Sequence, residues 1–239
     1  MENKSLLRAD KVYVTDKLYV RIPTVGEILD EEQKYFNIVN TLTAVPYQYM
    51  VQLDDEGVDF TTISEYELFL MLLPSYINED ISVVFGNLVI SDLLPDNNDG
   101  TTKLRSRHNN EVVIDEYVYY KLVETLRKVN NIEKVKYKPA NEEAKRYLIE
   151  RERKKQNRAK RKKKEVNLFE NFIVALVNRQ EFKYDYNSIM DLSYYCFNQS
   201  FNQIQTNINF DKTMDGIYSG TVDATKLKDK SCLSWIQTK

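Results

Sequence analysis

The sequence is poor in the residues on which most enzyme and metal sites depend. Among its 239 residues there is one histidine, His108, so a Ser/His/Asp or Cys/His centre would rest on that side chain alone. A site with several histidine ligands is excluded for the same reason. The two cysteines, Cys196 and Cys232, lie far apart in the chain, so they form neither a disulfide framework nor a paired-thiol zinc motif. Both fit a reducing compartment.

Long hydrophobic runs are also missing. The longest, Leu68–Leu73 and Phe172–Val177, have six residues each, whereas a membrane span needs roughly 18 or more. The polar start at residues 1–5 has no apolar stretch of the kind found in signal peptides. We therefore expect a cytoplasmic protein that makes no contact with a membrane.

The charge of the chain is nearly balanced in total and strongly segregated along its length. With 34 Lys and Arg against 36 Asp and Glu, the formal net charge is −2. Residues 145–164 hold 12 basic residues and two Glu, so the other 219 residues carry −12. Since 42% of the residues are hydrophobic, the chain can bury a sizeable core.

The first half of the sequence alternates helix and hairpin signals. Two β-rich runs at 12–14 and 18–22 predict a hairpin. Thr24 with Glu27 has capping-box spacing and predicts a helix over 25–42, which the acidic residues 30–32 could interrupt. A short helix is expected from Pro46 to Val51.

Further signals follow before residue 140. Ser64 with Glu67 predicts a helix that includes the apolar run to Leu73. The runs at 82–85 and 88–90 flank Gly86-Asn87 and predict a tight hairpin, the clearest β signal in the chain. Asp115 then predicts an N-cap for a helix that ends near Asn130.

The C-terminal part is dominated by one apolar stripe, formed by residues spaced 4, 3, 4, 3 and 4 apart. These residues are Met190, Tyr194, Phe197, Phe201, Ile204 and Ile208. The spacing predicts a helix of about 20 residues with one continuous apolar face. Together with a preceding helix that includes the run to Val177, it needs a partner surface in this chain or in another. We predict that this stripe binds a partner.

These signals predict a mainly α fold with small β-hairpins, an α+β organisation in three parts. We expect an N-terminal α+β domain over 1–140, a basic helix or linker over 141–166 and a helical part over 167–239.

The basic run is the second candidate contact surface. Its residues are Arg151, Arg153, Lys154, Lys155, Arg158, Lys160, Arg161, Lys162, Lys163 and Lys164. Clustered Lys and Arg release counterions from nucleic acid phosphates, so phosphate contact is one interpretation. The alternative is a solvated helix that only links two parts of the chain. The run contains no aromatic residue, which argues against a platform for stacking single-stranded bases.

Other patterns lack the residues that their chemistry requires. The acidic segments 54–59 and 96–100 do not have the ligand spacing of an EF-hand, so we expect turns at both. Gly216–Gly220 lacks the Gly-Lys-Ser/Thr sequence of a phosphate loop. His108 lies in a basic segment, 103–108, that we expect to be surface loop. We therefore predict no catalytic residues, no metal site and no cofactor, and we expect the protein not to be an enzyme. An acidic cluster that bound Mg²⁺ or Mn²⁺ would again make an enzyme a candidate.

Short sequence motifs at opposite ends of the chain carry a family resemblance. The N-terminal phrase is Ile22–Leu29. The C-terminal phrase comprises Phe182–Tyr186, Met190–Leu192, Met214–Asp223 and Leu233–Ile236. Together they resemble a family of tail assembly chaperone proteins from phages and prophages of Gram-positive (Firmicutes) bacteria. One departure is Ile189-Met190, which stands where the family resemblance leads us to expect a Trp.

The resemblance implies a non-enzymatic helper in the cytoplasm of the bacterial host. It would bind the long helical tape measure protein, or another tail protein, before the tail tube forms, and it could act as a homo-oligomer. Helix-in-groove binding uses apolar stripes such as the predicted one. Two other functions stay open: a structural tail or baseplate component that remains in the virion, and a nucleic-acid-binding accessory protein that uses residues 151–164.

Overall fold

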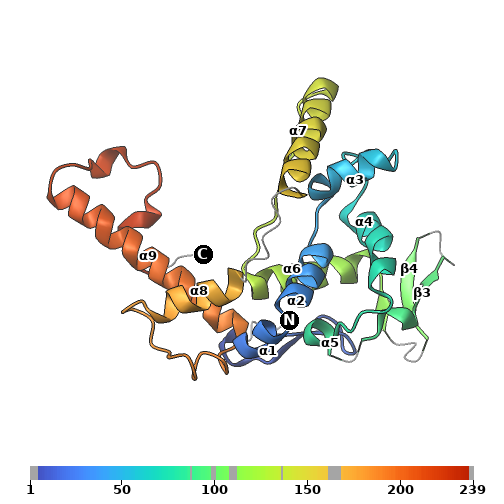
Figure 1. Cartoon of the computed structure of the whole chain (residues 1–239), viewed down its shortest axis with the longest axis horizontal. Helices are drawn as coiled ribbons and strands as arrows, with labels where there is room; N and C mark the ends of the chain where they lie inside the picture. The colour runs from blue at the N-terminus through green and yellow to red at the C-terminus, as the bar shows by residue number, and fades with distance from the viewer. Residues whose placement is uncertain are drawn as a thin grey trace.

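The computed structural model describes residues 5–86, 88–97, 101–107, 112–135, 137–160 and 168–236 (Figure 1). The α-helices are α1 (Val25–Asp30), α2 (Glu32–Leu42), α3 (Met50–Asp55), α4 (Glu65–Leu72), α5 (Ser82–Phe85), α6 (Glu116–Asn130), α7 (Glu142–Lys160), α8 (Leu168–Val177) and α9 (Tyr194–Tyr218). Short 3₁₀ turns cover Leu6–Arg8, Pro46–Tyr49, Leu73–Tyr76, Ile90–Asp92, Ala224–Lys226 and Ser231–Leu233. The strands are β1 (Lys11–Tyr13), β2 (Tyr19–Arg21), β3 (Leu93–Asp96), β4 (Lys103–Ser106) and β5 (Val113–Ile114).

The strands form two small antiparallel sheets within the described residues. β1 pairs with β2, with Lys11 opposite Arg21, which confirms the first predicted hairpin. β3, β4 and β5 form a second sheet in that order, with Leu104 of β4 opposite Ile114 of β5. β3 contains Pro95, which an edge strand tolerates because one side of it makes no ladder hydrogen bonds. The mainly α class with small β-hairpins is confirmed.

The predicted hairpin at 82–90 is wrong. Residues 82–85 form the helical turn α5, whose start is fixed by the Asp80 side chain, Oδ1 accepting a hydrogen bond from Ser82 N at 2.9 Å. Gly86, at φ +61°, ends that turn by donating its N–H to the Ser82 carbonyl. Its positive φ thus serves a helix C-terminus and not a hairpin loop. Asn87 lies outside the described residues.

The helix starts that were predicted from caps are confirmed. Thr24 and Glu27 form a complete capping box at the start of α1, and Ser64 and Glu67 form another at the start of α4. Asp115 Oδ1 accepts from Val118 N at 2.8 Å at the start of α6. The predicted 25–42 helix is indeed interrupted within its acidic stretch, since Glu31 lies between α1 and α2 with φ −131° and ψ 38°.

One main core joins the two ends of the chain. Val20, Ile28 and Leu126 of the N-terminal part and Ile189 and Phe197 of the C-terminal part are all at most 2% exposed in the same buried cluster. The C-terminal helices therefore meet their partner surface within this chain. The three-part division into 1–140, 141–166 and 167–239 stays a prediction, but its first and third parts share this core.

The backbone makes a direct joint between the two ends. Val25 N donates to the Leu192 carbonyl at 2.9 Å and Gly26 N donates to the Met190 carbonyl at 3.0 Å. A Cβ added at Gly26 would lie 3.2 Å from that carbonyl oxygen, closer than most side-chain contacts, so glycine suits this approach. We call these bonds the N–C joint.

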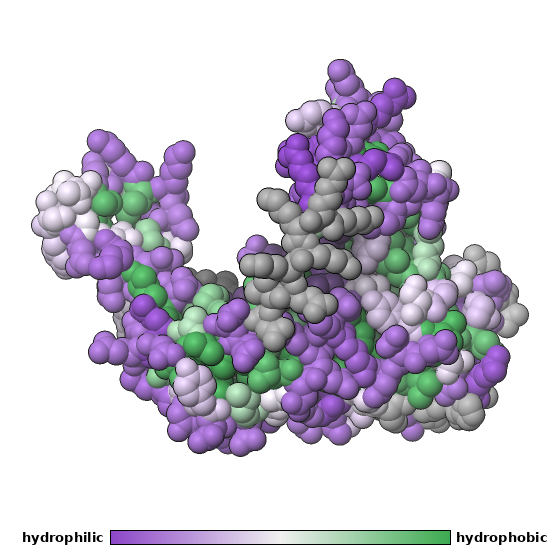
Figure 2. Space-filling model, in the orientation of Figure 1, coloured by the Kyte–Doolittle hydropathy of each residue, from purple (hydrophilic) through white to green (hydrophobic). Residues whose placement is uncertain are grey.

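Two helices leave the body in different directions (Figure 1). α7 stands out on one side, beside α3 at its base, and α9 runs outward on the other side until residues 219–236 turn back along it. α7 is a hydrophilic column in the space-filling view (Figure 2). Among the described helices, none has the length and hydropathy that crossing a bilayer requires.

Candidate functional site

The predicted partner-binding stripe is divided among three places in the structure. Tyr194, Phe197 and Ile204 are 7%, 0% and 5% exposed and belong to the main core. Met190 precedes α9, because Ser193 Oγ caps the helix by accepting from Cys196 N. The expectation that Met190 shares one helical face with the rest is therefore wrong, and its carbonyl takes part in the N–C joint instead.

The remaining stripe residues, Phe201 and Ile208, are half-buried and edge a shallow apolar groove between α8 and α9. The groove has a volume of about 150 Å³ and is lined by Phe172, Ala175, Leu176, Arg179, Phe201, Ile204, Gln205 and Ile208. We call it the α8–α9 groove. Hydrophobic surface is exposed over this part of the molecule (Figure 2).

Aromatic packing gives the α8–α9 groove its shape. The rings of Phe172 and Phe201 meet edge to face, with centroids 4.7 Å apart. Behind them Phe197 contacts Phe172 at 5.3 Å and Phe169 at 5.7 Å. Since Phe169 and Phe197 are buried in the main core, they support the lining residue Phe172 from behind. An open apolar hollow of this kind can take in part of a large apolar side chain.

The second candidate surface, the basic run, is helical where the structure describes it. Leu148 and Ile149 near the start of α7 are buried against Met50, Val51 and Leu53 of α3 in a second apolar cluster. The base of α7 is thus docked on the body. The sequence, which has no apolar residues suited to a core over 151–164, indicated a solvated helix or linker instead.

Acidic residues of the α3 region secure this docking. Arg153 donates through Nη1 to Asp55 Oδ1 at 2.6 Å and through Nη2 to Asp54 Oδ2 at 2.7 Å. Two parallel charge-assisted bonds of this kind fix the orientation of the guanidinium group. The acidic segment 54–59 therefore supplies counter-charges to α7, and Arg153 points toward the body instead of outward.

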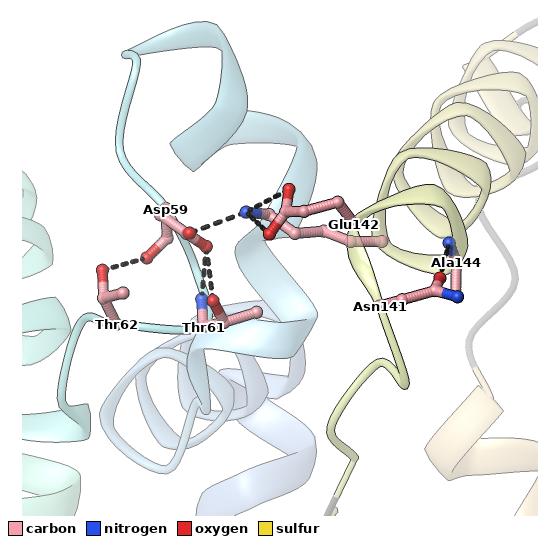
Figure 3. Close-up of polar contacts among 7 residues, drawn as sticks. Asp59, Thr61, Thr62, Asn141, Glu142 and Ala144 are labelled. Atoms are coloured by element: carbon pink, nitrogen blue, oxygen red, sulfur yellow. Dashed lines mark hydrogen bonds and ion pairs between the residues drawn. The ribbon is translucent and has the colours of Figure 1, made fainter.

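A similar contact lies about two turns nearer the start of α7 (Figure 3). Lys145 Nζ lies 2.6 Å from Asp59 Oδ2 and also contacts Glu142 at 3.3 Å. The hydrogen bond from Lys145, followed by one from Thr61 N, lowers the pKa of the Asp59 carboxyl to about 2. Asn141 caps the start of α7 by accepting from Ala144 N at 2.8 Å.

The outward side of α7 carries the other described basic residues. Arg151, Lys154, Lys155 and Arg158 are exposed. Lys154 lies 3.9 Å from Glu150, and Lys155 lies 3.3 Å from Glu152, so both interact within the helix. The side chain of Lys160 and the residues Arg161, Lys162, Lys163 and Lys164 lie outside what the structure describes.

The other candidates from the sequence are the metal-ligating residues, His108 and the glycine segment. Within the described ranges no group of three or more His, Cys, Asp or Glu side chains is placed to hold a metal ion. His108 lies outside those ranges. Gly216–Gly220 lies at the end of α9, where Thr221 N and Val222 N both donate to the Gly216 carbonyl and close a turn.

Comparison with known proteins gives one match. Residues 160–238 match the family model described as YomV second domain, a phage-associated domain family. The match covers α8, α9 and the residues that follow them, and hence the whole α8–α9 groove. Neither the search of curated proteins nor the search of solved structures returned a match.

Proposed function

We propose that this chain is a non-enzymatic binding protein of the tail assembly chaperone type, which binds the tape measure protein in the cytoplasm of the bacterial host while a phage tail is assembled. The single observation that carries the proposal is the α8–α9 groove, an accessible apolar hollow lined in part by the edge-to-face rings of Phe172 and Phe201. It lies in the region that matches a phage-associated family.

The chemistry of the groove fits a helical partner. A partner helix can place an apolar side chain in a hollow between two helices, as in helix-in-groove binding. Phe201 and Ile208 are seven positions, or about two helical turns, apart on α9, so they lie on the same face. Arg179 and Gln205 at the rim can contact polar residues of a partner helix.

The N–C joint supports the proposal because it brings together two of the motifs that carry the family resemblance. The phrase Ile22–Leu29 and the phrase Met190–Leu192 are far apart in sequence, yet their backbones are hydrogen-bonded to each other. Two of the segments that carry the resemblance therefore lie side by side, directly before α9. This is expected if the family shares a way of holding α9 and the groove.

The test uses neighbouring residues of α8 as a matched pair. Ala175 lines the groove, and Val174 is 44% exposed and does not line it. The full chain and its Ala175→Glu and Val174→Glu variants are titrated with helical segments of the tape measure protein from the same gene neighbourhood. We expect Ala175→Glu to weaken binding at least tenfold, because a carboxylate would fill an apolar hollow. Val174→Glu should change it less than twofold.

Two results would contradict the proposal. Equal binding by both variants would remove the groove from the interface. Many copies of the chain in purified particles, with no affinity for the tape measure segments, would favour the alternative function of a structural tail or baseplate component.

A further inference from the structure

We propose that the outward face of α7 binds the phosphate backbone of double-stranded nucleic acid. This proposal is independent of the α8–α9 groove, since the two surfaces lie on different helices and use different chemistry. The face consists of four basic residues with Tyr147 and Glu150 beside them, and we call it the α7 basic face. Its members are Tyr147, Glu150, Arg151, Lys154, Lys155 and Arg158.

The docking of α7 sorts its basic residues into two sets. Lys145 and Arg153 face acidic residues of the body at 2.6–2.7 Å and are neutralised there. Arg151 and Arg158 have no ion pair with any residue that the structure describes. Lys154 and Lys155 contact Glu150 and Glu152 of the same helix, in exposed pairs that contribute little. Burying Leu148 and Ile149 fixes which side of the helix points outward, so these lysines are presented together with the two unpaired arginines.

The spacing along the α7 basic face matches a polyanion. Tyr147, Arg151, Lys154 and Arg158 follow one another by four, three and four residues, which places them on one helical face. From residue 147 to residue 158 the helix rises about 16 Å. Along the same length, duplex DNA presents roughly five phosphates on each strand. Several basic side chains can therefore contact phosphates at once.

The composition of the face favours nucleic acid over an acidic protein. Protein interfaces are depleted in Lys and centred on buried apolar side chains. Among the described residues of this face, Tyr147, 65% exposed, is the large apolar side chain, and the others are charged. One aromatic ring is too few for a stacking platform, so duplex phosphate is favoured over single-stranded bases. The 219 residues outside 145–164 carry a net charge of −12, which repels a polyanion from the rest of the protein and directs it toward α7.

The experiment measures binding of the full chain to a 30-base-pair DNA duplex of random sequence by fluorescence anisotropy, at several salt concentrations. We expect a dissociation constant on the order of micromolar at low salt, and affinity that falls steeply as salt increases. A single strand of the same length and an acidic helical peptide are measured alongside.

The decisive variant is Arg151→Gln, Lys154→Gln, Arg158→Gln. Losing three phosphate contacts should flatten the slope of log affinity against log salt by about 3 and weaken binding on the order of a hundredfold at 0.1 M salt. The control, Lys226→Gln, Lys228→Gln, Lys230→Gln, removes three exposed charges from the C-terminal segment and should change affinity less than twofold. Circular dichroism checks that both variants keep their helices.

Several outcomes would overturn the proposal. No duplex binding at 50 mM salt would leave α7 as a solvated helix. Equal binding by the α7 variant would place the contact elsewhere. Tighter binding of the acidic peptide would identify a protein as the occupant, and at least tenfold tighter binding of the single strand would exclude a duplex.

Discussion

α7 and α9 both extend from the body of the protein, but they are held to it by different forces. α9 is anchored through Tyr194, Phe197 and Ile204 in the main core, where burial of apolar surface dominates. α7 rests on two apolar side chains, Leu148 and Ile149, and on ion pairs to exposed acidic residues. Exposed ion pairs contribute little stability. We therefore expect α9 to unfold only with the whole molecule and α7 to open locally.

The strongest way to break this comparison is to remove the anchor of α9. Phe197→Ala deletes a fully buried ring that contacts Phe169, Phe172 and Tyr194. The variant should lower the free energy of unfolding by about 3–5 kcal/mol, measured by urea denaturation. Tyr218→Ala, at a position 82% exposed on the same helix, should stay within about 0.5 kcal/mol. Similar losses in both variants would show that α9 is not anchored as described.

The matching change at α7 should have a local effect. Leu148→Ala removes an anchor that is 9% exposed and should destabilise the docked helix by about 2 kcal/mol. Hydrogen exchange should then become faster in α7 while the protection of α6 and α9 stays unchanged. Equally faster exchange in α9 would mean that the two clusters unfold as one and that the contrast between the helices does not hold.

Removing a buried hydrogen bond within the main core should reduce the free energy of unfolding by an intermediate amount. The Tyr35 hydroxyl donates to Asn130 Oδ1 at 2.8 Å, and burial raises the pKa of this phenol. Tyr35→Phe leaves the Asn130 oxygen without that donor and should reduce the free energy of unfolding by about 1–2 kcal/mol. Tyr117→Phe removes a hydroxyl from a side chain 66% exposed and serves as the control, with no measurable change expected in the same denaturation assay.

The smallest effect concerns pH at the base of α7. Because the folded pKa of Asp59 is about 2, below its ordinary value, the ion pair with Lys145 favours the docked helix above about pH 4. That contribution is lost as the pH falls from about 4 through 2, when the carboxylate is protonated. Carboxyl NMR titration should give the low pKa for Asp59, and Lys145→Gln should raise it. An unchanged value in the variant would show that Lys145 is not the cause.

The sequence predicts well where long periodic segments and side-chain caps agree. The starts of α1, α4 and α6 follow from Thr24, Ser64 and Asp115, since each cap is local in the chain and needs no knowledge of the fold. The burial of Phe197 and Ile204 likewise follows from the stripe, although the stripe alone does not say which surface covers them.

The sequence-based predictions fail where tertiary contacts determine the local structure. The run 82–85 is short enough for a strand or a helical turn. The hydrogen bond from Ser82 N to the Asp80 side chain and the burial of Val84 and Phe85 favour the turn. The second sheet has strands of two to four residues, too short for a periodic signal. The N–C joint uses backbone groups, which leave no trace in composition apart from Gly26.

The sequence singles out some of the residues that line the proposed site and misses others. Phe201, Ile204 and Ile208 were singled out from the sequence and line the α8–α9 groove, whereas Phe172 and Ala175 were not chosen as binding residues because the pairing of two helices is a tertiary feature. Arg153 was grouped with the basic contacts, yet it is bound to Asp54 and Asp55 across about 98 residues of chain. Such long-range pairs have no signature in sequence spacing.

Hydrogen exchange of the full chain, alone and with the helical tape measure segments bound, tests the central proposal most directly. If the α8–α9 groove holds the partner, new protection should appear over residues 172–179 and 201–208, with α7 unchanged. Protection confined to α7 or to the sheets, or complex formation with no protection at the groove, would contradict it.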